Sequence, residues 1–273
     1  MKSPVPYFGS KQSVADWIVG LLPDHDHYVE PYAGGLSVLL AKPPSRMETV
    51  SDLDAELMTF WRVLRDRPTE LIRACALTPH GRAELTATWD PTDDELELAR
   101  RIWCRLAQGR SGTLRNTGWR YYINPAGSVT SMPGYLEAYV DRLAAAAERL
   151  HAVSLENLPA LDLIAKYGQQ PKVLLYVDPP YLGSTRGWGR NYRHEMKTDS
   201  EHRELAAALT DSRAAVVLSG YNSPLYDELY DGWHRYEQPT MTGNAKTDKA
   251  RTEVLWSNQP LGDQMHLFDG VGA

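Results

Sequence analysis

The stretch Lys172-Val-Leu-Leu-Tyr-Val-Asp-Pro-Pro-Tyr181 joins a short apolar run to an acidic, proline-rich turn. Residues 173–177 show no polar alternation, which is typical of a strand that is buried on both faces of a parallel sheet. In an open α/β sheet, ligands bind in the crevice beyond the carboxyl ends of such strands. The sequence therefore predicts a parallel α/β sheet with a binding site at residues 178–181.

The turn after this strand presents hydrogen-bond acceptors in a rigid array. Pro179 and Pro180 fix φ and lack an amide N–H, so carbonyl oxygens stand beside the Asp178 carboxylate. The exocyclic amino group of a base can donate one hydrogen to Asp178 and the other to the Pro179 carbonyl. Its nitrogen lone pair then turns toward a methyl donor while Tyr181 stacks on the base. A purely structural role, in which the prolines end the strand and Tyr181 covers its edge, is the alternative.

Asp-Pro-Pro-Tyr after an apolar strand resembles the catalytic motif of DNA amino-methyltransferases, and nearly the whole chain resembles the Dam-like DNA adenine-N6 methyltransferases. The resemblance implies methyl transfer from S-adenosyl-L-methionine to N6 of adenine at a short site in double-stranded DNA, as in restriction-modification. Its catalytic residues would be Asp178, Pro179, Pro180 and Tyr181. Cytosine-N4 or RNA adenine methylation, a DNA-binding module with a decayed active site and a nucleotide-binding oxidoreductase stay open.

The composition is that of an ordinary globular protein. The chain has 273 residues, of which 42% are hydrophobic and 23% are charged, enough for one α/β core with an inserted subdomain. It has no signal-peptide core and no apolar stretch near the roughly 18 residues of a membrane span, so we expect a cytoplasmic monomer without a membrane partner. Cys75 and Cys104 form no Cys/His cluster, so no metal site is expected, and neither fits the nucleophile of cytosine-C5 enzymes.

Hydrophobic periodicity predicts an α/β fold with one doubly wound, mostly parallel sheet, which the resemblance makes Rossmann-like, of the class I methyltransferase type. The catalytic domain is expected to be discontinuous (1–77 and 135–258), with an inserted, mainly helical target-recognition region (78–134) and a flexible tail (259–273). Strands are expected at 27–30, 48–51, 153–155, 172–177, 214–218, 233–237 and 252–256, and helices at 37–42, 55–76, 93–106, 135–151, 160–167, 200–210 and 224–230.

A second strand end, Tyr28-Val-Glu-Pro-Tyr-Ala-Gly-Gly35, precedes a helix start. Glycines there let backbone amides approach a ligand closely, although an ordinary tight turn is the alternative. Asp52 follows the next strand, where a carboxylate can accept both ribose hydroxyls of a nucleoside cofactor. Leu36 stands where many Dam-like relatives have a third glycine, which leaves the geometry of the turn open.

The resemblance also assigns the cofactor site. It places Lys11, in the opening segment Tyr7-Phe-Gly-Ser-Lys11, against the methionine carboxylate and places Asn157 and Leu158 beside the adenine. The residues expected to bind S-adenosyl-L-methionine are Tyr7, Lys11, Tyr32, Ala33, Gly34, Gly35, Asp52, Asn157, Leu158 and Asp178. Ser219-Gly-Tyr-Asn222 either lines the same pocket or only ends its strand.

The charge distribution points to a DNA-binding region. The formal net charge is −6, but residues 100–132 contain six arginines and no Asp or Glu, and a local basic stretch is what a binding face requires. DNA contacts are expected from Arg110, Arg115, Asn116 and Arg120 in the insertion and from Arg186 and Arg190 after the catalytic turn. A solvated arginine-rich loop is the alternative.

The tail contains Gln264-Met-His-Leu-Phe268. It resembles the peptide by which bacterial DNA-processing proteins bind the replication sliding clamp. This segment is therefore expected to place Leu267 and Phe268 in an apolar pocket of the clamp, unless it folds back onto the domain.

Overall fold

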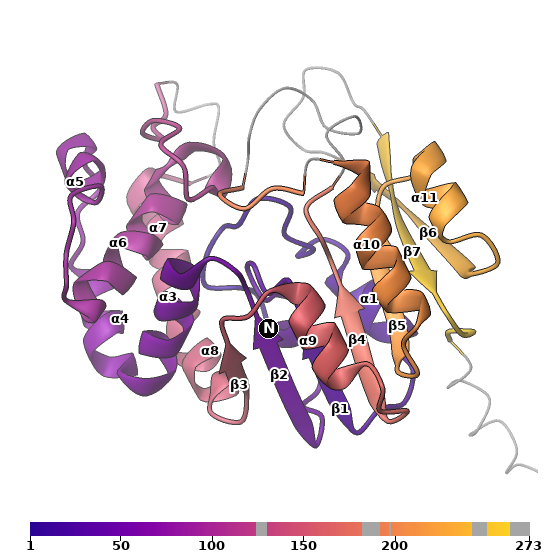
Figure 1. Ribbon diagram of the computed structural model, residues 1–273. Coiled ribbons are helices and arrows are strands. Elements are labelled where there is room, and N and C mark those ends of the chain that lie inside the picture. The colour runs from indigo at the N-terminus through magenta and orange to yellow at the C-terminus, as the bar shows by residue number, and fades with distance from the viewer. Residues whose placement is uncertain (124–129, 182–191, 197, 242–249, 263–273) are drawn as a thin grey trace, which may run out of the picture.

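The computed structural model describes residues 1–123, 130–181, 192–196, 198–241 and 250–262. Within these residues the strands form one seven-stranded sheet in the order β3-β2-β1-β4-β5-β7-β6 (Figure 1). The strands are β1 (His27–Glu30), β2 (Met47–Ser51), β3 (Ser154–Glu156), β4 (Val173–Val177), β5 (Ala215–Gly220), β6 (His234–Met241) and β7 (Ala250–Ser257). All seven lie where the sequence predicts strands, with end shifts of a few residues.

The sheet is mostly parallel, as predicted. Strands β1 to β5 pair in parallel, whereas β7 runs antiparallel to both β5 and β6. The chain order reverses between β1 and β4, which are neighbours in the sheet. Such a switch point opens a crevice at the carboxyl ends of the two strands, where a doubly wound sheet binds its ligand.

Helices cover both faces of the sheet because alternate strand residues point to opposite sides. On one face, Val29, Leu175 and Val216 pack against Leu163 and Leu205 of the helices in front of the sheet in Figure 1. On the other face, β1, β4 and β5 pack against the remaining helices. The helices are α1 (Ala15–Leu21), α2 (Ser37–Ala41), α3 (Ala55–Asp66), α4 (Pro68–Ala76), α5 (Arg82–Ala87), α6 (Glu95–Gln108), α7 (Met132–Val140), α8 (Leu143–Leu150), α9 (Ala160–Tyr167), α10 (Asp199–Thr210) and α11 (Pro224–Leu229).

Two of the long predicted helices are each divided. The prediction over 55–76 breaks at Arg67, which has φ −132°, directly before Pro68. A proline suits the first turn of a new helix and disfavours helical backbone in the residue before it. The prediction over 135–151 corresponds to α7 and α8, which meet at Asp141 and Arg142. Helices α1 and α5 are short and were not predicted.

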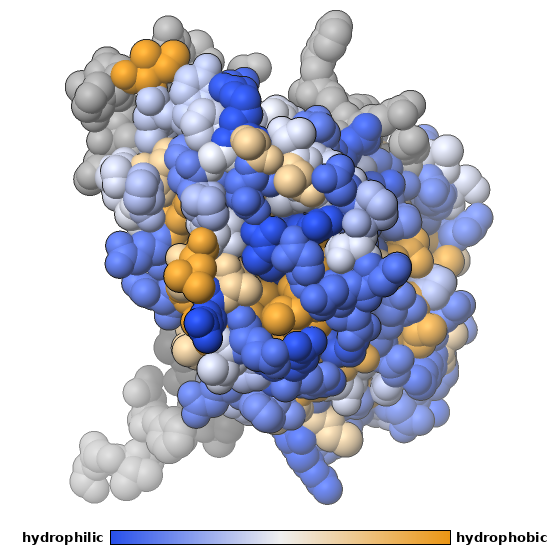
Figure 2. Space-filling model, turned by 90° about the vertical axis from the view of Figure 1, so that its left-hand side faces the viewer, coloured by the Kyte–Doolittle hydropathy of each residue, from blue (hydrophilic) through white to orange (hydrophobic). Residues whose placement is uncertain are grey.

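Helix α6, from the segment predicted to be an insertion, packs directly on α3. Ile102 and Trp103 of α6 are fully buried in the same apolar cluster as Phe60 and Trp61 of α3. Figure 1 shows α3 to α8 as one helical layer beside β3. Seen from that side, the surface is mostly hydrophilic with small separate apolar patches (Figure 2). The apolar sides of these helices therefore face inward.

Some predicted features fall outside the described residues: Arg186, Arg190 and the segment Gln264 to Phe268. Among the helices of the described residues, none combines the length and apolarity needed to cross a membrane.

Candidate active site

The turn Asp178 to Tyr181 lies at the carboxyl end of β4, next to the end of β1. Pro179 and Tyr181 are buried, whereas Asp178 keeps 19% of its side chain exposed. Burial raises the pKa of the Asp178 carboxyl, and the nearby Glu253 carboxylate adds to this effect, while Lys11 opposes it. The sequence placed an acceptor-rich turn here, and the structure puts its carboxylate at the crevice.

Lys11 reaches this turn from the opening segment. Its Nζ lies 2.8 Å from Asp178 Oδ1 and donates also to the Gly9 carbonyl at 3.2 Å. Burial acts to lower the pKa of Lys11, but the Asp178 and Glu253 carboxylates together raise it above its ordinary value. The ammonium group therefore stays charged beside the Asp178 carboxylate.

A residue that sequence reasoning missed, Glu253 on β7, completes this cluster. Its Oε1 accepts hydrogen bonds from Tyr181 Oη at 3.1 Å and from Ser219 Oγ at 2.6 Å. The signal in the sequence was a lone carboxylate at the head of the apolar run 254–256 in a predicted strand. Tyr221 packs its ring on Tyr181 with centroids 4.6 Å apart.

The glycine turn after β1 has left-handed backbone at Gly34 and Leu36, which settles the turn geometry that the sequence left open. Gly34 has φ +45°, and a Cβ there would come within 3.0 Å of the Tyr7 ring. Leu36 adopts φ +53° although it is not a glycine, and its side chain is fully buried. Burial of Leu36 therefore holds the turn in the conformation that a third glycine would adopt without strain. Trp61 Nε1 donates to the Gly34 carbonyl at 3.1 Å.

Asp52 fastens this turn to the end of β2. Its Oδ2 accepts from Gly34 N at 2.9 Å and its Oδ1 from Asp54 N at 2.9 Å. Burial raises the pKa of Asp52 to about 6, while the two backbone N–H groups oppose the rise. Each carboxylate oxygen keeps a second acceptor site, so the side chain can take two hydroxyl donors.

These elements enclose a cavity of about 340 Å³. Eight of the residues expected to bind the cofactor line it: Tyr7, Lys11, Tyr32, Ala33, Gly34, Gly35, Asp52 and Asp178. Asn157 and Leu158 lie behind this lining, where Asn157 Nδ2 donates to the Asp52 carbonyl at 2.6 Å and Leu158 N donates to Ser51 Oγ at 2.9 Å. Their neighbours Pro159, Ala160 and Leu161 form that part of the wall instead.

Residues 192–196, which we call the strap, line the other side of the cavity. Tyr192 Oη donates to the Phe8 carbonyl at 3.3 Å. Arg193 Nη1 lies 2.8 Å from Glu56 Oε2 and 3.3 Å from Asp54 Oδ1, and its Nε donates to the Leu114 carbonyl at 3.0 Å. Arg193 thus connects the strap, the first turn of α3 and the insertion.

Residues 7–91 match the family model of the D12 class N6 adenine-specific DNA methyltransferases, a range that includes the glycine turn and Asp52. A Type II methyltransferase, M1.LlaDCHI of Lactococcus lactis subsp. cremoris, is 25% identical over 270 residues, with 92% of this chain and 93% of the relative covered. This chain is thus similar to the D12 class of N6 adenine-specific DNA methyltransferases and, over nearly its whole length, to a Type II methyltransferase. It is accordingly an adenine-specific DNA methyltransferase.

Similar solved structures include two methyltransferases. One is a precorrin-6y C5,15-methyltransferase from Geobacter metallireducens, with a TM-score of 0.38 and 10% identity, covering 92% of each chain. The other is a SAM-dependent methyltransferase from Agrobacterium tumefaciens, with a TM-score of 0.41 and 11% identity, covering 92% of this chain and 62% of that one.

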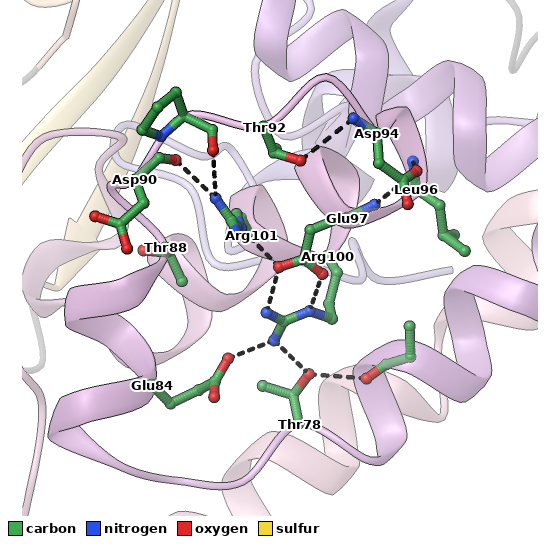
Figure 3. Close-up of polar contacts among 12 residues, drawn as sticks. Thr78, Glu84, Thr88, Asp90, Thr92, Asp94, Leu96, Glu97, Arg100 and Arg101 are labelled. Carbon is green, nitrogen blue, oxygen red and sulfur yellow. Dashed lines mark hydrogen bonds and ion pairs between the residues drawn. The ribbon is translucent and has the colours of Figure 1, made fainter.

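Half of the arginines in the basic stretch of this methyltransferase are engaged in internal ion pairs, contrary to the interpretation of residues 100–132 as one basic face. Arg100 lies between Glu84 and Glu97, with N–O distances of 2.6 and 2.7 Å, and Arg101 also contacts Glu97, at 2.6 Å (Figure 3). Arg105 is buried and pairs with Glu56 of α3 at 2.9 Å. These carboxylates come from outside residues 100–132, so the local charge count overlooked them.

The remaining arginines of the insertion lie around a loop closed by a bridge between Gly109 and Trp119. Arg110 and Asn116 are exposed, whereas Arg115 is half-buried. The Arg120 guanidinium lies 5.0 Å from the centre of the Tyr135 ring and donates to its hydroxyl. The loop contacts the cofactor side of the enzyme, because Phe8 N donates to the Gly112 carbonyl at 2.8 Å.

Proposed function

We propose that this methyltransferase holds S-adenosyl-L-methionine in the cavity between the glycine turn and the strap, and moves its methyl group to N6 of an adenine held at Asp178 and Pro179. The observation that carries the proposal is the opening of one cavity onto both Asp52 and Asp178, which follow β2 and β4, the two parallel strands on either side of β1. The cofactor supplies an electrophilic methyl group bonded to a positively charged sulfur.

The donor set of the cavity fits the polar parts of this cofactor. The Asp52 carboxylate, held by two backbone N–H groups, accepts the ribose hydroxyls. The methionine part lies against the backbone of Gly34 and Gly35. A side chain would not fit at Gly35, because its Cβ would come within 2.9 Å of Tyr7. Because Lys11 Nζ lies 2.8 Å from Asp178, its contact with the methionine carboxylate is shared with the catalytic turn. Asn157 and Leu158 act on the cofactor indirectly, through the Asp52 carbonyl and the Ser51 hydroxyl.

Asp178 orients the amino group of adenine. Its carboxylate accepts one N–H and the Pro179 carbonyl accepts the other, which frees the nitrogen lone pair for attack on the methyl carbon. As the N–C bond forms, the S–C bond breaks, and the amino nitrogen releases one proton, which Asp178 is placed to accept. Lys11 keeps Asp178 ionised before the transfer, because its positive charge opposes the effect of burial. Tyr181 contacts the base.

The target adenine must leave the duplex to reach Asp178, at a cost of a few kcal/mol. We propose that the DNA backbone is held by Arg110, Arg115, Asn116 and Arg120 of the insertion, with Arg186 and Arg190 after the catalytic turn. Support comes from a ladder of flat side chains beside the Gly109–Trp119 loop. His80 and Tyr121 each stack on the Trp119 indole, with ring centroids 4.5 and 5.3 Å away, and the exposed Arg82 lies 4.9 Å from the Trp119 ring.

A methylation assay tests the proposal. Purified enzyme and S-adenosyl-L-methionine with a labelled methyl group are incubated with duplex DNA, single-stranded DNA or RNA of matched base composition. We expect label in duplex DNA only, and N6-methyladenine after digestion to nucleosides. N4-methylcytosine, or label in RNA alone, would support the corresponding alternative. Mapping of methylated adenines in cells that express the protein would give the recognition sequence.

The tail carries a separate proposal, that Gln264 to Phe268 binds the replication sliding clamp. Its only support is the sequence, which matches an extended peptide with an apolar pair at its end. A pull-down of purified bacterial clamp by the wild-type protein is compared with the double variant Leu267→Ala/Phe268→Ala. Equal recovery with both proteins, or none with either, refutes clamp binding. We also propose that the enzyme works as a monomer in the cytoplasm.

A further inference from the structure

Glu253 is a buried carboxylate that takes no direct part in the proposed methyl transfer. It lies on β7 and is 4% exposed. The antiparallel register of β5 and β7 pairs Gly220 with Val254, which brings Glu253 to the carboxyl end of β5. A carboxylate in such a place costs several kcal/mol unless it is paired and hydrogen-bonded. Its partners therefore indicate what it does.

The partners of Glu253 converge on the catalytic turn. Its Oε1 accepts from Tyr181 Oη at 3.1 Å and from Ser219 Oγ at 2.6 Å. The same oxygen lies 3.8 Å from Lys11 Nζ, the atom that contacts Asp178 at 2.8 Å. Lys11 Nζ also lies 4.7 Å from the centre of the Tyr181 ring. The Glu253 carboxylate thus contacts Tyr181 directly and reaches Asp178 through Lys11.

We propose that Glu253 is a positioning residue for methyl transfer, which holds Tyr181 through its hydroxyl and Asp178 through Lys11. The inference rests on the proposed function and deepens it. Without the Glu253 carboxylate, the Tyr181 hydroxyl loses its acceptor and Lys11 loses its second anionic neighbour. Both catalytic side chains then sample more orientations, and misplacement by about 1 Å can cost on the order of 100-fold in rate.

Glu253 also adds to the electrostatic environment of Asp178. The charged and titratable groups that face Asp178 are Lys11 of the opening segment, Glu30 of β1, Tyr176 of β4, Tyr181 of the turn and Glu253 of β7. The negative charge of Glu253 disfavours ionisation of Asp178, so its removal should lower the pKa of Asp178. A residue with only a structural role would not shift the acid limb of the rate profile in that direction.

Glu253→Gln is the primary test, because the amide keeps the size and the acceptor oxygen of the side chain but removes its charge. Glu237→Gln is the matched control, since this exposed carboxylate on the adjacent β6 pairs with Arg235 at 2.6 Å. We expect kcat of Glu253→Gln to fall about 10- to 100-fold, with unchanged affinity for S-adenosyl-L-methionine and an acid limb at lower pH. The control should match the wild type in all three measurements.

Tyr181→Phe provides a second test that does not depend on activity. This change keeps the ring and removes only the hydroxyl that donates a hydrogen bond to Glu253. A double-mutant cycle of Glu253→Leu, which removes the acceptor oxygen that Gln keeps, and Tyr181→Phe is measured in the unfolding free energy of the protein without ligand, and in kcat. If the two residues act through their contact, the combined effect is smaller than the sum of the single effects.

The outcomes separate the inference from the proposed function. Additive effects in the cycle, or Glu253→Gln with wild-type kcat and an unmoved acid limb, overturn the positioning role. A wild-type protein that methylates no adenine in DNA refutes the proposed function instead, and the cycle in unfolding free energy still tests the Glu253–Tyr181 contact. If Glu253→Gln does not fold, Tyr181→Phe alone decides. A kcat reduced at least about threefold, with unchanged cofactor affinity, supports the inference and a wild-type kcat overturns it.

Discussion

Lys11 Nζ and Asp178 Oδ1 lie 2.8 Å apart, which joins the first segment of the chain to the catalytic turn. The lysine side chain is 5% exposed and the carboxylate 19%, so solvent screens this pair little. The positive charge of Lys11 thereby opposes the rise that burial causes in the pKa of Asp178. Predictions for its removal and for the other site residues follow from the same geometry.

Lys11→Met should move the acid limb of kcat toward higher pH. The positive charge of Lys11 lowers the pKa of Asp178 against the effects of burial and Glu253. Without that charge, Asp178 binds its proton more tightly, and a higher pH is needed to ionise it. The measurement is kcat from pH 5.5 to 9 at saturating DNA and cofactor. Lys172→Met, an exposed lysine at the other end of β4, is the control, and an unmoved limb in Lys11→Met would contradict the assignment.

Asp178→Ala should lose about 100-fold or more in methyl transfer while it binds S-adenosyl-L-methionine with nearly normal affinity. Asp178 orients the amino group of the base, and its side chain contacts Lys11 rather than the glycine turn. Single-turnover rates and calorimetric titration of the cofactor separate the two effects. Asp231→Ala removes an exposed carboxylate before β6 and serves as the control. Near-normal turnover in Asp178→Ala would refute the mechanism.

Cofactor affinity should fall as the pH drops through about 6. Burial raises the pKa of Asp52 to about 6, and only the ionised carboxylate accepts both ribose hydroxyls. Above this pH the group is ionised and binding is strongest. Calorimetric titration at pH 5, 6, 7 and 8 measures the dissociation constant. Asp52→Asn should bind more weakly at pH 8 and show a flatter pH dependence. If the variant has the same profile as the wild type, another group contacts the ribose.

Arg115→Ala and Arg120→Ala should each raise the Michaelis constant for DNA and reduce the slope of affinity against salt by about one ion. Cofactor binding should not change, because neither side chain lines the cavity. Arg46→Ala is the matched control, since this exposed arginine precedes the amino end of β2, whereas the cavity lies at the carboxyl ends of the strands. DNA affinity equal to that of the wild type in both variants would place the recognition surface elsewhere in the insertion.

Glu30→Gln should stabilise the protein increasingly as the pH rises from 5 to 8. Burial raises the pKa of Glu30 from 4.5 to about 8, so the folded state keeps a proton that the unfolded chain has released. Between these values folding takes up a proton, and the stability of the wild type falls with rising pH. Thermal unfolding should show a gain in Tm of at least about 2 °C for the variant at pH 8. A difference in Tm that does not vary with pH would contradict this account.

Local patterns determined much of this protein. The apolar run before Asp178 and the glycines before Ser37 specify strand ends and tight turns through backbone preferences that act within a few residues. These patterns predicted the succession of strands and helices along the chain. They also predicted the two turns that line the cavity, after β1 and after β4. Helix breaks were less well predicted. Pro68 indicates a helix start, but the continuous apolar spacing over 55–76 favoured one long helix in the prediction.

Tertiary structure decided which side chains act together. Lys11 and Asp178 are 167 positions apart in the chain, and Tyr181 and Glu253 are 72 apart, so no local spacing relates them. The same reason explains the arginines of α6: Glu56 and Glu84, which lie before this helix in the chain, pair with Arg105 and Arg100 once the helices pack. The sequence by itself determined where the chain forms strands, turns and acceptors. Packing determined the charge state of each group, because burial and the nearest opposite charge arise only in the folded chain.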